Sequence, residues 1–176
     1  MTMGGREVKL ARHGFARKQE WKLEEQSDNM VALSLSSADH AELLEQYPYP
    51  FKIVARYTID AEKVAVSYEV TNEGTEDMPF FVGGHPGFKC PLDGGESYDD
   101  YELRFEQREA AELCTAVPST GLIDVEHRSK NPMVGHDLPL THELFDFAET
   151  IFDVLESRVV TLTKKTEDKG VRLTFP

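Results

Sequence analysis

Two neighbouring stretches decide the fold, FKIVARYTI at 51–59 and KVAVSYEVT at 63–71. In both of them apolar side chains recur at every second residue, and Val54 is the one apolar residue on the opposite face of the first stretch. A period of two is the repeat of a β-strand that buries one face. The three residues at 60–62 are few enough for a hairpin turn, so the two stretches predict a pair of antiparallel strands.

Further segments with strand character occur along the whole chain. The segment 79–84, PFFVGG, reads as a third and more deeply buried strand. The other candidate strands are 21–26, 29–36, 100–106, 158–163 and 169–175. Strands without helices between them favour antiparallel sheets, and hence a mainly-β sandwich or barrel.

Helical and irregular segments are few. One helix is expected at 41–46, capped by residues 37–39, and a weaker helical turn is expected near 141–145. Residues 114–140 show little periodicity and contain several prolines and glycines. They are expected to form a long irregular connection, which in compact domains is often a functional segment.

Length and composition indicate one globular domain. The chain has 176 residues, with 19 basic and 32 acidic side chains and a formal charge of −13. A chain this acidic, without a basic patch, is not expected to bind nucleic acid. Two cysteines, Cys90 and Cys114, form neither a disulfide framework nor a zinc site. No apolar run suits a signal peptide or a membrane span, so we expect a reduced, cytoplasmic protein.

Six histidines are the first candidates for chemistry. His40 lies among acidic residues of the predicted helix and is expected to be a solvated surface side chain. His127, His136 and His142 share the irregular region with acidic residues that could join them around a metal ion. None of them has the spacing of a known zinc motif, and no glycine-rich phosphate loop is present, so neither a metal nor a cofactor is expected.

Two histidines stand in settings that suit ligand binding. His13 opens the motif HGFAR, whose glycine allows a ligand close to the backbone, and Arg17 would add a fixed cation. His85 lies in GGHPGF, where Pro86 favours extended backbone and the glycines leave space around the ring. Such an imidazole suits proton transfer near neutral pH. The alternatives are a turn with incidental polar residues around His13 and a structural histidine at 85.

Four motifs, taken in order, resemble the aldose 1-epimerase, or galactose mutarotase-like, family, and most closely its LacX-type bacterial branch. They are HGFAR (13–17), YPYPF (47–51), VSYEVTN (66–72) and GGHPGFKCPL (83–92). The later stretch 138–162 is also similar to that branch in order and spacing. The resemblance implies a single galactose mutarotase-like carbohydrate-binding domain over 1–176, built as an antiparallel β-sandwich with an open polar cleft for a sugar.

The same resemblance implies a reaction. The family interconverts the α and β anomers of an aldose: a base takes the proton of the C1 hydroxyl, an acid protonates the ring oxygen, and the ring opens and recloses. His85 matches the acid, and His13 matches a histidine that hydrogen-bonds the sugar near its ring. Arg17 would hold a sugar hydroxyl, or the phosphate of a hexose phosphate.

The sequence also departs from the family pattern. The family's base is a glutamate near the C-terminus, and the chain stops at Pro176, where that segment should begin. A part of the fold that precedes the HGFAR motif is absent as well, so the chain is expected to be incomplete at both ends. An aspartate that binds the sugar in relatives is out of register, with Asp146 and Glu149 close to its expected position.

Three hypotheses therefore stay open from the sequence. The first is an aldose 1-epimerase-type enzyme that acts on an aldose or a hexose phosphate. The second is a carbohydrate-binding protein without catalysis, which keeps the binding groups and lacks the base. The third is an inactive fragment whose exposed sheet edges pair with other chains.

Overall fold

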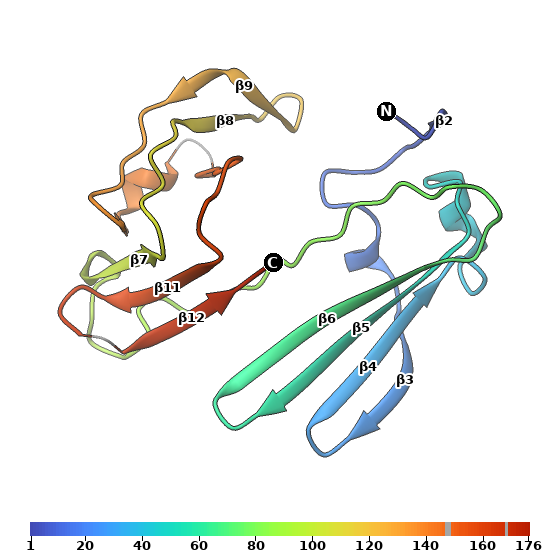
Figure 1. Cartoon of the computed structure of the whole chain (residues 1–176), viewed down its shortest axis with the longest axis horizontal. Helices are drawn as coiled ribbons and strands as arrows, with labels where there is room; N and C mark the ends of the chain where they lie inside the picture. Colours follow the sequence, from blue (N-terminus) through green and yellow to red (C-terminus); the bar gives the residue numbers. More distant parts are fainter. Residues whose placement is uncertain (147–148, 168) are drawn as a thin grey trace. The chain divides into compact units, whose positions relative to one another are not determined.

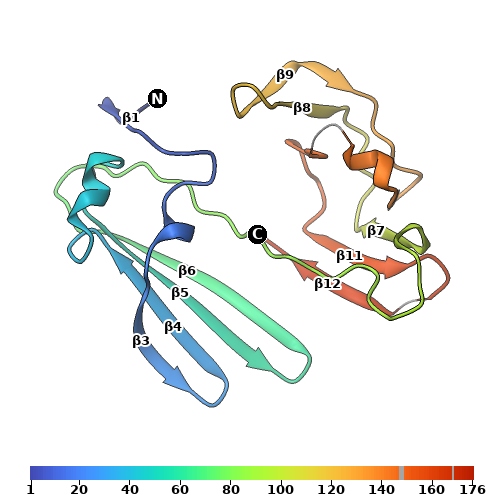
Figure 2. The ribbon, with the colours of Figure 1, turned by 180° about the vertical axis from the view of Figure 1, so that it is seen from behind.

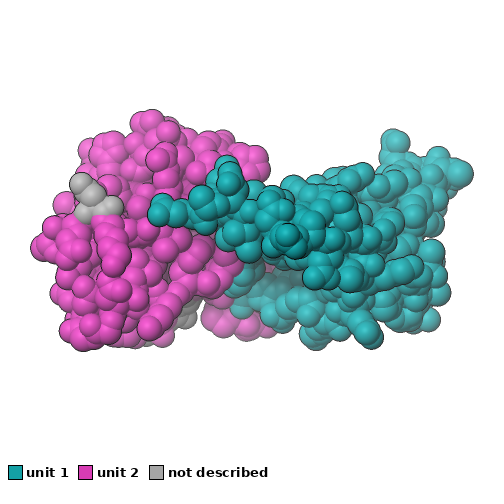
Figure 3. Space-filling view, turned by 90° about the horizontal axis from the view of Figure 1, so that it is seen from below, with its two compact units in different colours: residues 1–85 teal, residues 86–176 magenta. Residues whose placement is uncertain are grey.

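The computed structural model describes residues 1–146, 149–167 and 169–176, and it consists of antiparallel β-sheets joined by turns and short 3-10 helices (Figure 1). The chain divides into two compact units, Met1–His85 and Pro86–Pro176 (Figure 3). Each unit contains a hydrophobic cluster of its own. Among the described residues, no helix is long and apolar enough to cross a bilayer.

Unit 1 is built on a four-stranded antiparallel sheet in the order β3-β4-β5-β6 (Figure 2). Its strands are β3 (Lys22–Ser27), β4 (Met30–Ser36), β5 (Phe51–Asp60) and β6 (Lys63–Asn72). The hairpin predicted from the alternating pattern is β5 and β6, which pair over their whole length without a bulge. Two small strands, β1 (Thr2–Met3) and β2 (Arg6–Glu7), pair at the N-terminus.

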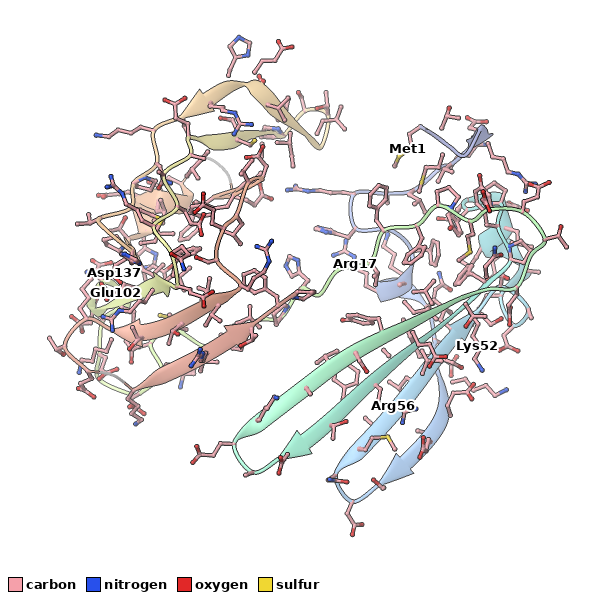
Figure 4. The ribbon with its side chains drawn as sticks, viewed as in Figure 1. Met1, Arg17, Lys52, Arg56, Glu102 and Asp137 are labelled. Carbon is pink, nitrogen blue, oxygen red and sulfur yellow. The ribbon has the colours of Figure 1, made fainter. Side chains whose placement is uncertain are left out.

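The register of the sheet separates an apolar face from a charged one. Leu35 of β4 lies opposite Ile53 of β5, which lies opposite Val70 of β6, so these side chains share one face. On the other face Lys52 pairs with Glu24 at 3.0 Å, and Figure 4 labels Lys52 on β5. The sheet therefore has one face that suits a hydrophobic core and one that suits solvent.

The core of unit 1 covers one end of the apolar face. Leu43, whose side chain is 0% exposed, lies in the 3-10 helix η2 (Ala41–Glu45) at its centre. The other buried members are Val8, Leu35, Tyr47, Tyr49 and Phe51. Both tyrosine hydroxyls are satisfied there, because each donates a hydrogen bond to a backbone carbonyl at 2.7 Å.

Unit 2 holds a second four-stranded antiparallel sheet and a separate hairpin. The sheet runs in the order β10-β7-β11-β12, and its strands are β7 (Tyr101–Phe105), β10 (Asp137–Pro139), β11 (Val159–Lys164) and β12 (Gly170–Thr174). The hairpin is β8 (Leu113–Val117) and β9 (Leu122–Ser129). The 3-10 helices are η3 (Tyr98–Asp100) and η4 (His142–Phe145).

An ion-pair network crosses the second sheet at its β10 edge. Arg104 of β7 donates hydrogen bonds to Glu102 at 2.7 Å and to Asp137 of β10 at 3.1 Å, and Figure 4 labels both acids. Because Arg104 lies directly opposite Asp137 in the register, the ion pair strengthens the pairing of these two strands.

The predicted fold class is confirmed: the chain is mainly β, and its sheets are antiparallel. Seven predicted strands are also confirmed, and their bounds agree with the structure to within one residue at each end. They are 21–26, 29–36, 51–59, 63–71, 100–106, 158–163 and 169–175.

Two predictions of local structure were wrong, and a third was confirmed with a different helix type and start. The segment 79–84 forms no strand, and Phe81 within it is 93% exposed. This apolar run therefore does not lie in a core, and its backbone enters no ladder among the described strands. The predicted helix at 41–46 is present as a 3-10 helix, Ala41–Glu45, in which the N–H of residue i+3 donates to the carbonyl of residue i. It follows His40 rather than a cap at 37–39.

The expected irregular connection at 114–140 instead contains β8, β9 and β10. Its hairpin turns at Gly121, whose φ of 69° favours glycine. Six of the eight residues of β9 are exposed, so neither face of that strand is buried. A strand without a buried face gives no period-two signal, and for this reason the sequence pattern failed to reveal it.

Candidate functional site

A tight turn presents His13 at the surface of unit 1. The N–H of Gly14 donates a hydrogen bond to the carbonyl of Ala11 at 2.8 Å, and Gly14 has a φ of 65°. The glycine is needed there because residues with a side chain rarely adopt this backbone conformation. His13 is exposed on this turn, as a ligand-binding side chain should be.

Phe15 anchors the HGFAR motif to the core. Its ring lies 5.4 Å from that of Phe51 and 6.2 Å from that of Tyr47, measured between centroids. The 3-10 helix η1 (Ala16–Lys18) follows, and the indole N–H of Trp21 donates a hydrogen bond to the carbonyl of Ala16 at 3.0 Å. With Phe15 packed inward, the side chains at the two ends of the motif remain at the surface.

His85 lies next to His13, although the two are far apart in the sequence. Their ring centroids are 5.6 Å apart and the rings meet edge to face, at 76°. Both side chains are exposed. Within the described residues the imidazole of His85 has no hydrogen-bond partner, so its nitrogens are available to a ligand.

The segment that leads to His85 is fixed at its start. Tyr47 donates a hydrogen bond from its hydroxyl to the carbonyl of Pro79 at 2.7 Å, and Asn72 donates one from its side-chain amide to the carbonyl of Glu76 at 2.8 Å. These bonds hold the chain after β6 against the core. The motif YPYPF therefore contributes a tyrosine that holds this segment, a role that the sequence pattern does not reveal.

A cavity of about 210 Å³ lies beside the HGFAR motif within unit 1. His13 and Phe15 line it together with apolar side chains of β5, β6 and the segment 78–83. The volume is below the range of roughly 300–1,000 Å³ that is usual for pockets that enclose a drug-sized ligand. It is large enough to receive one apolar part of a small ligand whose polar part contacts the histidines.

Arg17 adds an available cation to this surface. It lies in η1, where Figure 4 labels it, and its guanidinium is exposed. In the part of the chain that the structure describes, it forms no hydrogen bond or ion pair. Arg12 and Lys18 are close in sequence, so a chain of charge −13 carries three cations between residues 12 and 18. Such groups suit hydroxyl oxygens or a phosphate.

Two predicted sugar-binding acids, Asp146 and Glu149, belong to unit 2. Asp146 is the residue at the C-terminal end of η4, and its N–H donates a hydrogen bond to the carbonyl of Glu143 at 3.4 Å. Both carboxylates are exposed. The role of these two acids in binding a sugar stays a prediction.

The remaining histidines have other neighbours. His127 Nδ1 lies 2.9 Å from a carboxylate oxygen of Asp124, and His142 stacks on Tyr98 with the ring centroids 4.7 Å apart. His40 lies 3.3 Å from the carboxylate of Glu42. Over residues 1–146, 149–167 and 169–176, no group of three or more His, Cys, Asp or Glu side chains is placed to hold a metal ion.

The side chains whose pKa values are shifted most strongly lie in unit 2, where ion pairs and burial explain the shifts. The pKa of Asp153 lies far below its usual range, because Arg128 donates two hydrogen bonds to its carboxylate at 2.7 and 2.9 Å. Burial raises the pKa of the Cys114 thiol, and burial also raises that of Cys90. A raised pKa favours the protonated thiol over the thiolate, which is the reactive form.

The fold is that of galactose mutarotase-like proteins. A galactose mutarotase-like protein from Lactobacillus casei matches 98% of this chain and 58% of its own length, at a TM-score of 0.77 and 28% identity. A galactose mutarotase related enzyme from Lactobacillus acidophilus matches 97% of this chain and 56% of its own length, at a TM-score of 0.80 and 25% identity. These likenesses agree with the predicted fold type.

Sequence relatives define the family. Residues 4–176 match the aldose 1-epimerase family. The plasmid and chromosomal LacX proteins of Lactococcus lactis subsp. lactis are each 39% identical to the chain over 167 residues, which is 94% of this chain and 55% of each relative. The chain belongs to the aldose 1-epimerase family and spans little more than half the length of these relatives.

Proposed function

We propose that the chain acts as an aldose 1-epimerase-type protein on the anomeric carbon of an aldose or a hexose phosphate. The observation that carries this proposal is the contact between His13 and His85, two exposed imidazoles from the two histidine motifs of the family. We also propose that both units belong to one galactose mutarotase-like carbohydrate-binding domain. The match of a single family across residues 4–176 supports this view.

The proposed reaction needs proton transfers alone. His85, as the imidazolium, gives a proton to the ring oxygen while the C1 hydroxyl proton leaves to a base, and the C1–O5 bond breaks to give an open-chain aldehyde. Rotation about C1–C2 and the reverse transfers close the ring as the other anomer. In this scheme His13 hydrogen-bonds the sugar near its ring, and Asp146 and Glu149 are candidates for holding its hydroxyls.

The role of the base is not assigned to a residue of this chain. In the family this role belongs to a glutamate. His13, His85 and Arg17 are binding groups in themselves, and binding a sugar does not by itself give turnover, because catalysis requires interactions that are stronger in the transition state. The second candidate is therefore a non-catalytic carbohydrate-binding protein, or an inactive fragment of an enzyme.

Arg17 offers a way to distinguish the two substrate classes. Its guanidinium is exposed and unpaired within the described residues, so a phosphate would find a charged hydrogen-bond donor there. If the substrate is a hexose phosphate, replacing Arg17 by Met should weaken its binding about tenfold or more while leaving binding of the free aldose nearly unchanged. Lys22→Met on β3 removes an exposed cation outside the motif and serves as the matched control.

Proton NMR of a freshly dissolved anomer tests the proposed activity. The rate at which the second anomer appears is measured with and without the protein, for several aldoses and their phosphates. Acceleration above the buffer rate supports the enzyme. Heat of binding in calorimetry without acceleration supports the carbohydrate-binding protein, and neither heat nor acceleration with any sugar rejects both.

A further inference from the structure

Strand β6 is an exposed edge of the sheet in unit 1. It ends the strand order β3-β4-β5-β6, so within unit 1 its one strand neighbour is β5, as Figures 1 and 2 show. Nine of its ten residues are exposed. It contains neither proline nor glycine, and its register with β5 is continuous. At the opposite edge, β3 is interrupted by a register shift between Leu23 and Glu25, a device that discourages pairing.

The unpaired backbone groups of β6 belong to its even-numbered residues. Asp60 lies opposite Lys63 across a two-residue turn, and the pair that closes such a turn exchanges hydrogen bonds. Along an antiparallel strand, successive residues direct their N–H and C=O groups to alternate sides. Lys63 thus points these groups toward β5, whereas those of Val64, Val66 and Tyr68 point outward. These three residues also carry exposed apolar side chains.

We propose that two copies of the chain associate by pairing β6 with β6, antiparallel, around a two-fold axis at Val66. In this register Val66 lies opposite its own copy and Val64 lies opposite Tyr68. Lys63 lies opposite Glu69, and the symmetry repeats this ion pair on the other side of the axis. A two-fold interface needs a surface that complements itself, and this order of residues provides one.

Other registers are less favourable for physical reasons. A shift of one copy by a single residue places the apolar side chains of one β6 on the charged face of the other. A shift by two residues keeps the faces aligned but moves Lys63 opposite Ser67 or Thr71, so both ion pairs are lost. In the proposed register Lys63 and Glu69 form a pair without cross-strand hydrogen bonds, in which side chains are closest.

Charge reversal is the main test, because it acts on side chains that do not pack in the core. Sedimentation equilibrium over a series of concentrations gives the dimer dissociation constant of the whole chain. Lys63→Glu or Glu69→Lys alone places like charges opposite each other twice, and we expect each to weaken the dimer about tenfold. The double variant reverses both charges and should return the dissociation constant to within about threefold of the original. Lys22→Glu on β3 is the matched control and should change little.

A backbone variant and a crosslink examine the two-fold axis. Val66→Pro removes an outward N–H only, so it should abolish the dimer while the thermal melt of the chain persists. Val66→Cys should form an intermolecular disulfide on mild oxidation more readily than Val64→Cys, because only residue 66 meets its own copy. A monomer at all concentrations overturns the proposal. A dimer that tolerates the single reversals, or that the double variant fails to restore, overturns it as well.

Discussion

We predict that the carboxylate of Glu109 contributes strongly to the free energy of unfolding. Its side chain is 3% exposed, and its two oxygens accept hydrogen bonds from the backbone N–H groups of Ser157 at 2.8 Å and Glu156 at 3.0 Å. Glu109 thereby ties the chain after β7 to the chain before β11. The change Glu109→Gln keeps the size of the side chain but replaces one acceptor oxygen by an amide group, which then faces an N–H donor.

The expected loss follows from the hydrogen bonds. A hydrogen bond to a charged group contributes about 1.5–3 kcal/mol, and a buried N–H left without an acceptor costs about 1–3 kcal/mol, two effects that overlap. We expect Glu109→Gln to lower the free energy of unfolding by roughly 2–4 kcal/mol near neutral pH. This is a large part of the stability of an ordinary domain.

The pH dependence supplies an independent check. Burial raises the pKa of Glu109, but the N–H groups of Glu156 and Ser157 outweigh burial and hold the pKa below its usual range. A lowered folded-state pKa means that the stabilisation is present above the unfolded value of about 4.3 and is lost as the pH falls through the folded value. The wild type should therefore lose more stability on acidification than the Glu109→Gln variant does.

Urea denaturation followed by circular dichroism, near pH 7 and below pH 4, measures both effects. Glu126→Gln, at an exposed glutamate of β9, is the matched control and should change neither stability nor its pH dependence appreciably. Equal small effects of Glu109→Gln and Glu126→Gln, or an equal response of wild type and Glu109→Gln to acid, would show that the Glu109 carboxylate does not stabilise the fold in this way.

The other predictions concern a buried side chain, a close backbone contact and a buried hydrogen bond. Leu43→Ala should lower the free energy of unfolding by about 2–5 kcal/mol in urea denaturation, because the side chain is fully buried; a loss near zero contradicts the proposed core. Gly170→Ala should lower the melting temperature by at least several degrees, since a Cβ there collides with the carbonyl oxygen of Leu162, and an unchanged melt contradicts the β11–β12 register. Tyr47→Phe should cost about 1 kcal/mol and speed amide exchange after Pro79, whose carbonyl loses its donor; unchanged exchange there counts against the anchoring role.

The strands with one buried face could be predicted from the sequence. The hairpin of β5 and β6 was visible because an apolar residue occurs at every second position, and this repeat reflects the sheet face on which those side chains lie. The apolar pattern gave a wrong strand at 79–84, because a continuous apolar run does not reveal whether its side chains are buried. It failed again at β9, whose residues are exposed on both faces.

The candidate site was predicted only as separate pieces. His13 and His85 could be selected from the glycines around them and from the family motifs, but their contact depends on how the chain folds between them. Nothing in a local pattern encodes a distance between residues so far apart in sequence. The hydrogen bond from Tyr47 to Pro79 was missed for the same reason, although two tyrosines between prolines are an unusual pattern.

The proposed role of His85 in anomer exchange is tested most simply by measuring the exchange rate by NMR for the wild type, for His85→Asn and for a control, His127→Asn. His127 is exposed and its partner is Asp124, so its loss should not affect the reaction. We expect the wild type and His127→Asn to accelerate exchange equally, and His85→Asn to lose about 10²–10⁴-fold of the acceleration. Acceleration that persists without the imidazole of His85, or a wild type that gives only the buffer rate, would contradict this expectation.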